Sequence, residues 1–203
     1  FLVFLVAKWG GNAVIYGIVG AAYSVFQLIG APILGRWSDT YGRRRILLLS
    51  QLGTLIAWIA LALDFALPTQ ALARVDSAWV GSFVLTLPLL VLFLSRAFDG
   101  LTGGNISVAN AYLADISDDQ TRSTNFGKMA VAANFGFVLG PAISGVLGGT
   151  AWGELVPVLA AVAISVVASL IILLKLPETN PCILAADPEQ PGVHGIFGQD
   201  RKQ

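Results

Sequence analysis

Long apolar stretches separated by short polar segments dominate this chain. Five stretches are close to membrane length: 13–34, 46–67, 85–113, 129–147 and 155–174. A helix rises about 1.5 Å per residue, so roughly 20 apolar residues cross the hydrocarbon core of a bilayer. The first stretch has no charged residue and the second has only Asp64. The pattern therefore predicts an all-α membrane protein.

The two ends of the chain differ from this pattern. Residues 1–7 are apolar but too few to cross a membrane, and they begin without a methionine or a basic leader. We expect the remnant of a truncated first helix, and therefore a fragment of a longer protein. Residues 177–203 are rich in Pro, Gly and acids, which predicts a cytosolic loop or tail without packing. The expected organisation is a transmembrane bundle over 1–176 followed by this tail.

Composition agrees with a membrane protein and excludes several other classes. Hydrophobic residues make up 56% and charged residues only 12% of the chain, about half of what a soluble domain carries. The net charge is zero, so we expect no nucleic-acid partner. Cys182 and His194 are the only residues of their kind, and both fall in the predicted solvated tail. We therefore expect no disulfide, no metal site and no enzyme activity that uses His as a base.

Basic residues indicate the orientation of the bundle. If the arginine-rich segment 36–45 faces the cytosol, nine Lys and Arg residues lie on the inner side, two on the outer side, and Arg96 within a span. The inner residues are Arg36, Arg43, Arg44, Arg45, Arg122, Lys128, Lys175, Arg201 and Lys202. The outer residues are Lys8 and Arg74. This asymmetry fits the positive-inside rule.

The segment between the first two full spans reads GRWSDTYGRRRI. We expect Gly35 and Gly42 to let the chain turn there, and Asp39 to hold at least one neighbouring arginine. Asp115 should emerge on the same side and join them. We call this set the loop cluster: Gly35, Asp39, Gly42, Arg43, Arg44 and Asp115. A charge network that forms and breaks at one mouth is a plausible two-state element. The alternative, that the arginines only fix orientation, does not explain Asp39 or the glycines.

Arg96 lies inside the stretch 85–113 and must face protein or a water-filled cavity. A strip of small residues follows at helical spacing and predicts close packing against a neighbouring helix: Gly100, Gly103, Gly104 and Ser107. Asp99 lies three residues further along and can reach Arg96. Two interpretations of Asp99 stay open. It either serves only as a counter-ion, or takes up and releases a proton in a coupled site.

Small residues also recur along the stretch 129–147. The spacing singles out Gly127, Gly136, Gly140, Pro141 and Gly145. Every fourth residue from Ala132 to Gly148 is small, which predicts a groove that a second helix can enter. Pro141 removes a backbone donor and predicts a kink. On physical grounds alone the pattern indicates tight helix packing.

Four polar residues inside the spans are candidates for lining a substrate cavity: Gln27, Asn105, Asn110 and Asn134. Single polar residues in membrane helices more often make hydrogen bonds between helices. Both interpretations stay open.

Four phrases occur in an order that resembles the N-terminal half of a twelve-helix transporter of the major facilitator superfamily: GAPILGRWSDTYGRRRILLLS, RAFDGLTGGN, AYLADIS and FGFVLGPAISGVLGG. The resemblance is closest to the tetracycline/proton antiporter group. It implies a six-helix half whose partner half is missing, with the substrate between the halves. It also implies a latch at the loop cluster, a role in proton transfer for Arg96, and antiport for the glycine pattern. Asp99 departs from the family, in which Gln is common, and Ser144 replaces a glycine.

The resemblance implies secondary active transport by alternating access, with proton-coupled export of small amphiphilic compounds or drugs. The proton gradient would supply the energy without a cofactor. The implied partners are the lipid bilayer, a small-molecule substrate and the missing half, and the implied location is a cell membrane, the bacterial inner membrane. One alternative is a facilitative carrier or symporter of a sugar or other metabolite. Another is a non-transporting scaffold or an inert fragment.

Overall fold

The computed structural model describes residues 1–180 and 183. Its elements in chain order are α1 (Leu2–Lys8), α2 (Ala13–Tyr41), α3 (Arg43–Asp64), β1 (Ala71–Ser77), β2 (Gly81–Thr86), α4 (Leu87–Thr102), α5 (Asn105–Asp115), α6 (Arg122–Gly148) and α7 (Leu155–Lys175). Among these described residues, five helical segments have the length and apolar character to cross a membrane, with α4 and α5 together forming one of them. The predicted all-α membrane architecture is confirmed.

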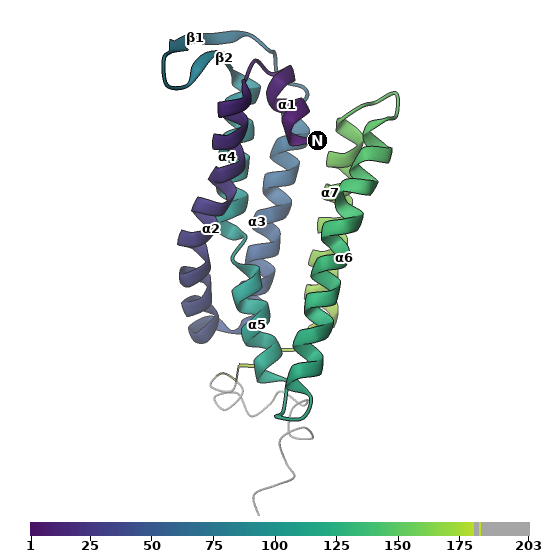
Figure 1. Cartoon of the computed structure of the whole chain (residues 1–203). Helices are drawn as coiled ribbons and strands as arrows, with labels where there is room; N and C mark the ends of the chain where they lie inside the picture. The colour runs from purple at the N-terminus through teal and green to yellow at the C-terminus, as the bar shows by residue number, and fades with distance from the viewer. Residues whose placement is uncertain (181–182, 184–203) are drawn as a thin grey trace, which may run out of the picture.

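The long helices stand side by side, with both ends of the bundle clearly defined (Figure 1). Helix α4 packs along α2 and α3, and α3 also packs on α7. The α2–α3 turn, the α5–α6 loop and the end of α7 lie at one end, whereas α1, the hairpin and the α6–α7 loop lie at the other. The segments predicted to be cytosolic therefore share one end of the molecule.

The turn between α2 and α3 differs from the expectation. Helix α2 does not end at Leu34 but continues through Gly35 to Tyr41. Gly35 is therefore a helical residue and not a turn residue. The chain turns at Gly42 alone, which has φ 103°, a left-handed value that favours glycine. The next helix begins directly after it, at Arg43.

The predicted fourth span is interrupted. Helix α4 ends at Thr102 and α5 begins at Asn105, so the strip of small residues does not lie on one continuous helix as expected. The close packing expected of the strip is nevertheless present. A Cβ atom on Gly100 would collide with the backbone of Tyr23, and one on Gly104 would lie 2.8 Å from Cα of Ala31. Both contacts are made with α2.

Gly30 on α2 makes the reciprocal close approach, because a Cβ atom there would collide with the backbone of Leu101. Replacing Gly30 with Ala is expected to lower the free energy of unfolding by about 1–3 kcal/mol, since two backbones must separate. Gly20 lies on the same helix with no atom within 4 Å of its Cβ position. Gly20→Ala is the matched control and should not destabilise the chain, because Ala favours helix over Gly. Thermal unfolding in detergent measures both, and equal melting temperatures would contradict this packing.

A two-stranded antiparallel hairpin, not expected from the sequence, links α3 to α4. Its strands pair from Ala71 with Thr86 to Ser77 with Gly81. The side-chain amide of Asn12 donates to the carbonyl oxygens of Val80 (2.8 Å) and Ser82 (3.2 Å). The hairpin thus docks on the turn between α1 and α2, where Asn12 also caps α2.

In the part of the chain that the structure describes, two clusters of buried side chains form the core. The cluster near the hairpin comprises Leu5, Val6, Trp9, Val19, Leu61, Leu89, Leu92 and Val158. The cluster near the loop end comprises Leu34, Ile46, Leu47 and Val108. Helix α6 contributes no buried residue, so in the described chain it lies at the edge of the bundle.

Asp64, the last residue of α3, is buried to 1% exposure, and neither carboxylate oxygen has a hydrogen-bond partner among the described residues. A buried polar group without a partner costs free energy. We expect Asp64→Asn, which keeps the shape and removes the ionisable group, to unfold at a temperature no lower than the parent. A clear drop in melting temperature would show that the carboxylate has a stabilising partner.

Candidate functional site

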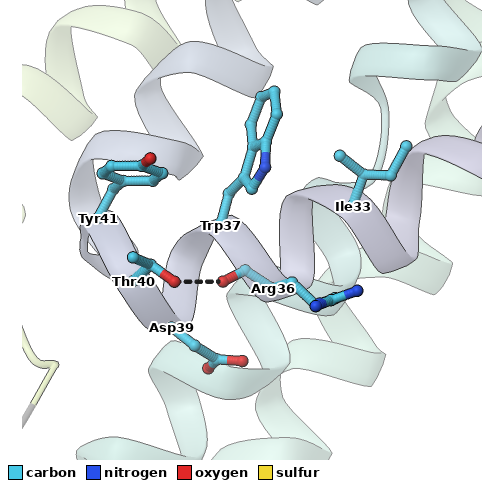
Figure 2. A pocket seen from close by; sticks show the side chains of 6 residues that line it. All are labelled: Ile33, Arg36, Trp37, Asp39, Thr40 and Tyr41. Atoms are coloured by element: carbon cyan, nitrogen blue, oxygen red, sulfur yellow. Dashed lines mark hydrogen bonds between the residues drawn. The ribbon is translucent and has the colours of Figure 1, made fainter.

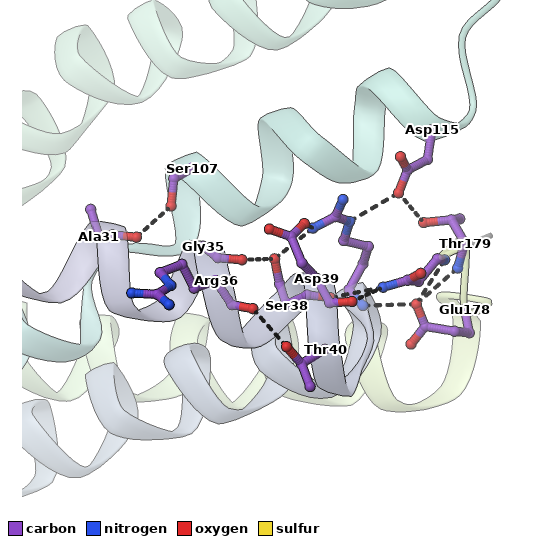
Figure 3. Close-up of polar contacts among 12 residues, drawn as sticks. Ala31, Gly35, Arg36, Ser38, Asp39, Thr40, Ser107, Asp115, Glu178 and Thr179 are labelled. Carbon is purple, nitrogen blue, oxygen red and sulfur yellow. Dashed lines mark hydrogen bonds and ion pairs between the residues drawn. The ribbon is translucent and has the colours of Figure 1, made fainter. Parts of the chain in front are cut away.

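Residues of α2 and α5 bind the guanidinium of Arg43, which belongs to α3. Figure 3 shows Ser38, Asp39 and Asp115 in this network. The Nε of Arg43 donates to Oδ2 of Asp115 on α5 at 3.0 Å, and one terminal nitrogen lies 2.5 Å from Oδ1 of Asp39 on α2. The same nitrogen donates to the hydroxyl of Ser38 at 2.8 Å. The side chains of Arg43 and Asp115 are only 12% and 15% exposed. The predicted contact between Asp115 and the arginines is thus present, and it joins α2, α3 and α5 in one network.

A further carboxylate joins this network from beyond α7. Oε1 of Glu178 accepts a hydrogen bond from the backbone N–H of Arg43 at 2.7 Å, and Oε2 accepts one from that of Arg44 at 3.2 Å. These N–H groups open α3 and have no partner within the helix. A carboxylate at this position satisfies them and interacts favourably with the helix dipole. Sequence reasoning missed Glu178. The signal was an acid shortly after the last span, on the same side as the loop cluster.

Residues 177–180, which we call the post-α7 segment, pack onto the end of α2 as well. The side-chain amide of Asn180 donates to the carbonyl oxygens of Ser38 (3.1 Å) and Asp39 (2.8 Å), near the C-terminus of that helix. Thr179 and Asn180 are 8% and 3% exposed. The expectation of a tail without packing is therefore wrong for this segment, because its polar groups satisfy helix ends. Apart from residue 183, the rest of the tail, including Cys182 and His194, lies outside the described residues.

The other arginines of the loop have different surroundings. Arg44 donates from its guanidinium to the carbonyl oxygen of Leu173 on α7 at 2.6 Å. Arg36 lines a shallow hollow together with Ile33, Trp37, Asp39, Thr40 and Tyr41 (Figure 2). All six residues belong to α2, so this hollow is a feature of one helix surface and not a path between helices.

Arg96 and Asp99 form an ion pair inside the bundle, with a terminal guanidinium nitrogen 2.9 Å from Oδ2. Their side chains are 15% and 7% exposed. The guanidinium carbon also lies 4.9 Å from the ring centre of Trp58 on α3. The expected reach of Asp99 to Arg96 is thus present. The geometry fits a counter-ion and a proton-binding carboxylate equally, and the role in transport stays a prediction.

The glycine pattern of α6 faces open space in the described chain. A Cβ atom on Gly127, Gly136, Gly140 or Gly145 would have no neighbour within 4 Å. The half of this face nearest α1 forms a pocket with α1, and its lining includes Phe1, Phe4, Pro141, Ser144 and Glu154. The tight helix packing that the pattern indicates is therefore not made at these four glycines by any described helix, and their role stays a prediction. The kink at Pro141 stays a prediction.

Glu154 brings a negative charge to this pocket. The pKa of its carboxyl lies below the ordinary value of 4.5, chiefly because its own backbone N–H donates to it. Partial burial opposes this shift, and Lys8 adds to it. Nζ of Lys8 lies 3.3 Å from Oε2 of Glu154, so the pair links the end of α1 to the start of α7. Both side chains are substantially exposed, so the pair contributes little to stability.

The four polar cavity candidates lie on three helices: Gln27 on α2, Asn105 and Asn110 on α5, and Asn134 on α6. The amide of Gln27 donates to the hydroxyl of Tyr23 on its own helix (3.2 Å) and to the carbonyl oxygen of Gly103 at the end of α4 (2.9 Å). The second bond is the hydrogen bonding between helices considered above. Asn134 donates to Ala130 on its own helix at 2.8 Å. Asn105 and Asn110 on α5 are half-buried. A role in substrate binding stays a prediction for all four.

Comparison with known proteins finds similarity to one family along most of the chain. The profile of the Major Facilitator Superfamily matches residues 1–198. The chain is 36% identical over 165 residues to the tetracycline resistance protein, class E, of Escherichia coli, a match covering 81% of the chain and 35% of that protein. It is 30% identical over 184 residues to major facilitator superfamily domain-containing protein 10 of Mus musculus, covering 90% of the chain and 34% of that protein. The chain thus spans about a third of the length of these relatives.

Proposed function

The chain belongs to the major facilitator superfamily, and on that premise we propose that it forms the N-terminal half of a transporter that exports small amphiphilic compounds in exchange for protons. Transport, and not catalysis, is the activity that membership of this family indicates. The observation that carries the proposal is the ion pair of Arg96 and Asp99 within a membrane-spanning helix. Charged groups at such a depth are costly and mark ion or proton pathways.

The mechanism that we propose is alternating access. The half described here rocks against a second six-helix half, and the substrate binds between them near the middle of the bilayer. Asp99 takes up a proton when the site faces outward and releases it when the site faces the cytosol. Arg96 stabilises the charged form of Asp99 and so favours the release. The open glycine face of α6 is a surface along which another helix can approach and slide.

At the cytosolic end, the loop cluster and Glu178 hold α2, α3, α5 and the post-α7 segment in one arrangement. We propose that this network acts as a latch that stabilises one conformation of the transporter. Its bonds are directional and depend on charge, so a small movement of α5 relative to α3 breaks several of them together. The proton gradient, without a cofactor, supplies the energy.

Export is the direction we propose because relatives such as the class E and class C proteins carry the name tetracycline resistance. A drug-like, partly apolar molecule is the substrate class that follows. The proposed location is the inner membrane of a bacterium, as suggested by the Escherichia coli relatives. The mouse relative makes a eukaryotic membrane the alternative.

The full-length protein in proteoliposomes tests this proposal. With an imposed pH gradient, a fluorescent amphiphilic cation or tetracycline should move against its own gradient while protons move the opposite way. Substrate moving together with protons identifies a symporter. Movement only down the substrate gradient, independent of pH, identifies a facilitative carrier. Absence of flux for every compound tested favours the scaffold alternative.

A further inference from the structure

The Arg96–Asp99 pair has a third neighbour, the indole ring of Trp58. The guanidinium carbon of Arg96 lies 4.9 Å from the centre of this ring, within the range of a cation–π interaction. Trp58 belongs to α3, whereas both charged residues belong to α4. The contact therefore ties the charge pair to a neighbouring helix.

Arg96 has few hydrogen-bond partners in the described structure, so the contact with Trp58 is an important part of its surroundings. Its Nε and one terminal nitrogen, Nη2, are buried and have no hydrogen-bond partner among the described residues. Nη2 does lie 2.9 Å from the Asp99 carboxylate, so that approach is an ion pair and not a well-directed hydrogen bond. Within the described chain, the charge of Arg96 is offset by one carboxylate and one aromatic face.

Asp99 and Trp58, the two partners of Arg96, respond differently when Asp99 binds a proton. A protonated Asp99 no longer offsets the positive charge, whereas the quadrupole of an indole ring does not change. A desolvated guanidinium with no compensating group is costly. The state with a proton on Asp99 is therefore the state in which the Trp58 ring matters most.

We propose that Trp58 is a positioning residue for proton coupling: its ring holds the Arg96 guanidinium in place when Asp99 carries the proton. This inference rests on the proposed role of Asp99 in proton-coupled export. Trp58 acts through Arg96 and need not touch the substrate. The energy difference between the protonated and deprotonated states then depends on an aromatic residue of a different helix.

One further ionisable group faces the pair. The hydroxyl of Tyr23 on α2 interacts electrostatically with both Asp99 and Arg96, and it accepts a hydrogen bond from Gln27 at 3.2 Å. Among the charged and titratable residues that the structure describes, Arg96, Asp99 and Tyr23 are the groups that the proposal involves. Tyr23 is kept unchanged in the test.

The test uses full-length protein in proteoliposomes, with tetracycline or a fluorescent amphiphilic cation as the probe, and measures proton-driven transport as a function of pH. Trp58→Leu is expected to lower the midpoint of the pH profile by about one unit, because the state with a proton on Asp99 loses a stabilising contact. KM should stay within roughly twofold of the parent. Trp58→Tyr and Trp58→Phe keep an aromatic face and should move it less, in the same direction. Trp9→Leu is the matched control, because Trp9 is a core tryptophan that packs on Phe65 without contacting Arg96.

An unchanged midpoint in Trp58→Leu, or the same shift in the leucine and phenylalanine variants, overturns the proposal. If Trp58→Leu does not fold, the tyrosine and phenylalanine variants decide it alone, and two parental midpoints would refute it. Asp99→Asn separates this failure from that of the proposed function. Loss of pH dependence in Asp99→Asn with no effect of Trp58→Leu refutes only the role of Trp58. Parental pH dependence in Asp99→Asn refutes the coupling site itself.

Discussion

Asp99→Asn in the full-length protein is expected to reduce proton-driven substrate accumulation by at least about 100-fold, the lower range for removing a positioned proton-transfer group. The amide has nearly the same shape as the carboxylic acid, but it cannot take up or release a proton. The side chains of Arg96 and Asp99 are 15% and 7% exposed, so the change also leaves the Arg96 guanidinium without its carboxylate and should lower the melting temperature. The loss of coupling is therefore measured separately, on variant protein that is shown to be folded.

Two transport modes separate coupling from binding. Uphill transport driven by a pH gradient should be lost, whereas exchange of labelled for unlabelled substrate at equal pH should persist, because exchange needs no net proton movement. Loss of both modes would indicate damage to the substrate site or to the fold. If the Asp99→Asn variant still concentrates substrate, Asp99 has the role of a counter-ion only.

Asp64→Asn is the matched control for this experiment. Asp64 is also a buried aspartate of a membrane helix, with 1% exposure, but no cation or hydrogen-bond donor among the described residues contacts its carboxylate. The Asp64→Asn variant should therefore retain uphill transport. A similar loss of uphill transport in both variants would mean that removing any buried carboxylate of the bundle impairs transport. That result would contradict a specific role of the Arg96–Asp99 pair.

The parts of the fold that could be predicted from the sequence are those that depend on the composition of long segments. Apolar length predicts the spans, and the uneven distribution of Lys and Arg predicts which loops share one end. The contact of Asp115 with the arginines followed from that topology, because an acid emerging on the arginine-rich side has few other partners. The structure places it 3.0 Å from Nε of Arg43.

The features that were missed depend on tertiary hydrogen bonds without a local pattern. In the sequence, Glu178 is one acidic residue in a polar tail. Its role becomes visible only in the folded chain, where the first N–H groups of α3 lie beside its carboxylate. The continuation of α2 past Gly35 was missed because a glycine permits a turn without requiring one. The hairpin was missed because its turn docks on Asn12, many residues earlier in the chain, and no pattern within 71–86 shows that contact.

Arg43→Ala is expected to have the second-largest effect, at least a tenfold loss of transport together with a lower melting temperature. Removing the guanidinium leaves the Asp115 carboxylate, 15% exposed, without its ion-pair partner and breaks the link between α3, α2 and α5. Breaking one side of a buried charge pair costs about 3–5 kcal/mol, and partial exposure here brings the expected cost to the lower end of that range or below it. Thermal unfolding of Arg43→Ala, Asp115→Asn and the double variant measures the coupling directly, and we expect the two single effects not to add.

Arg45→Ala decides between a latch and a purely topological role for the arginines. Arg45 belongs to the same run of bases and contributes equally to the positive-inside count, but its side chain is exposed. If the arginines only fix orientation, the Arg43 and Arg45 variants should behave alike, because each removes one positive charge from the same loop. If the network around Arg43 stabilises one conformation, Arg45→Ala should transport like the parent, while Arg43→Ala should change the accessibility of cysteines placed at the two mouths. Equal behaviour of the two variants would reduce the loop cluster to an orientation signal.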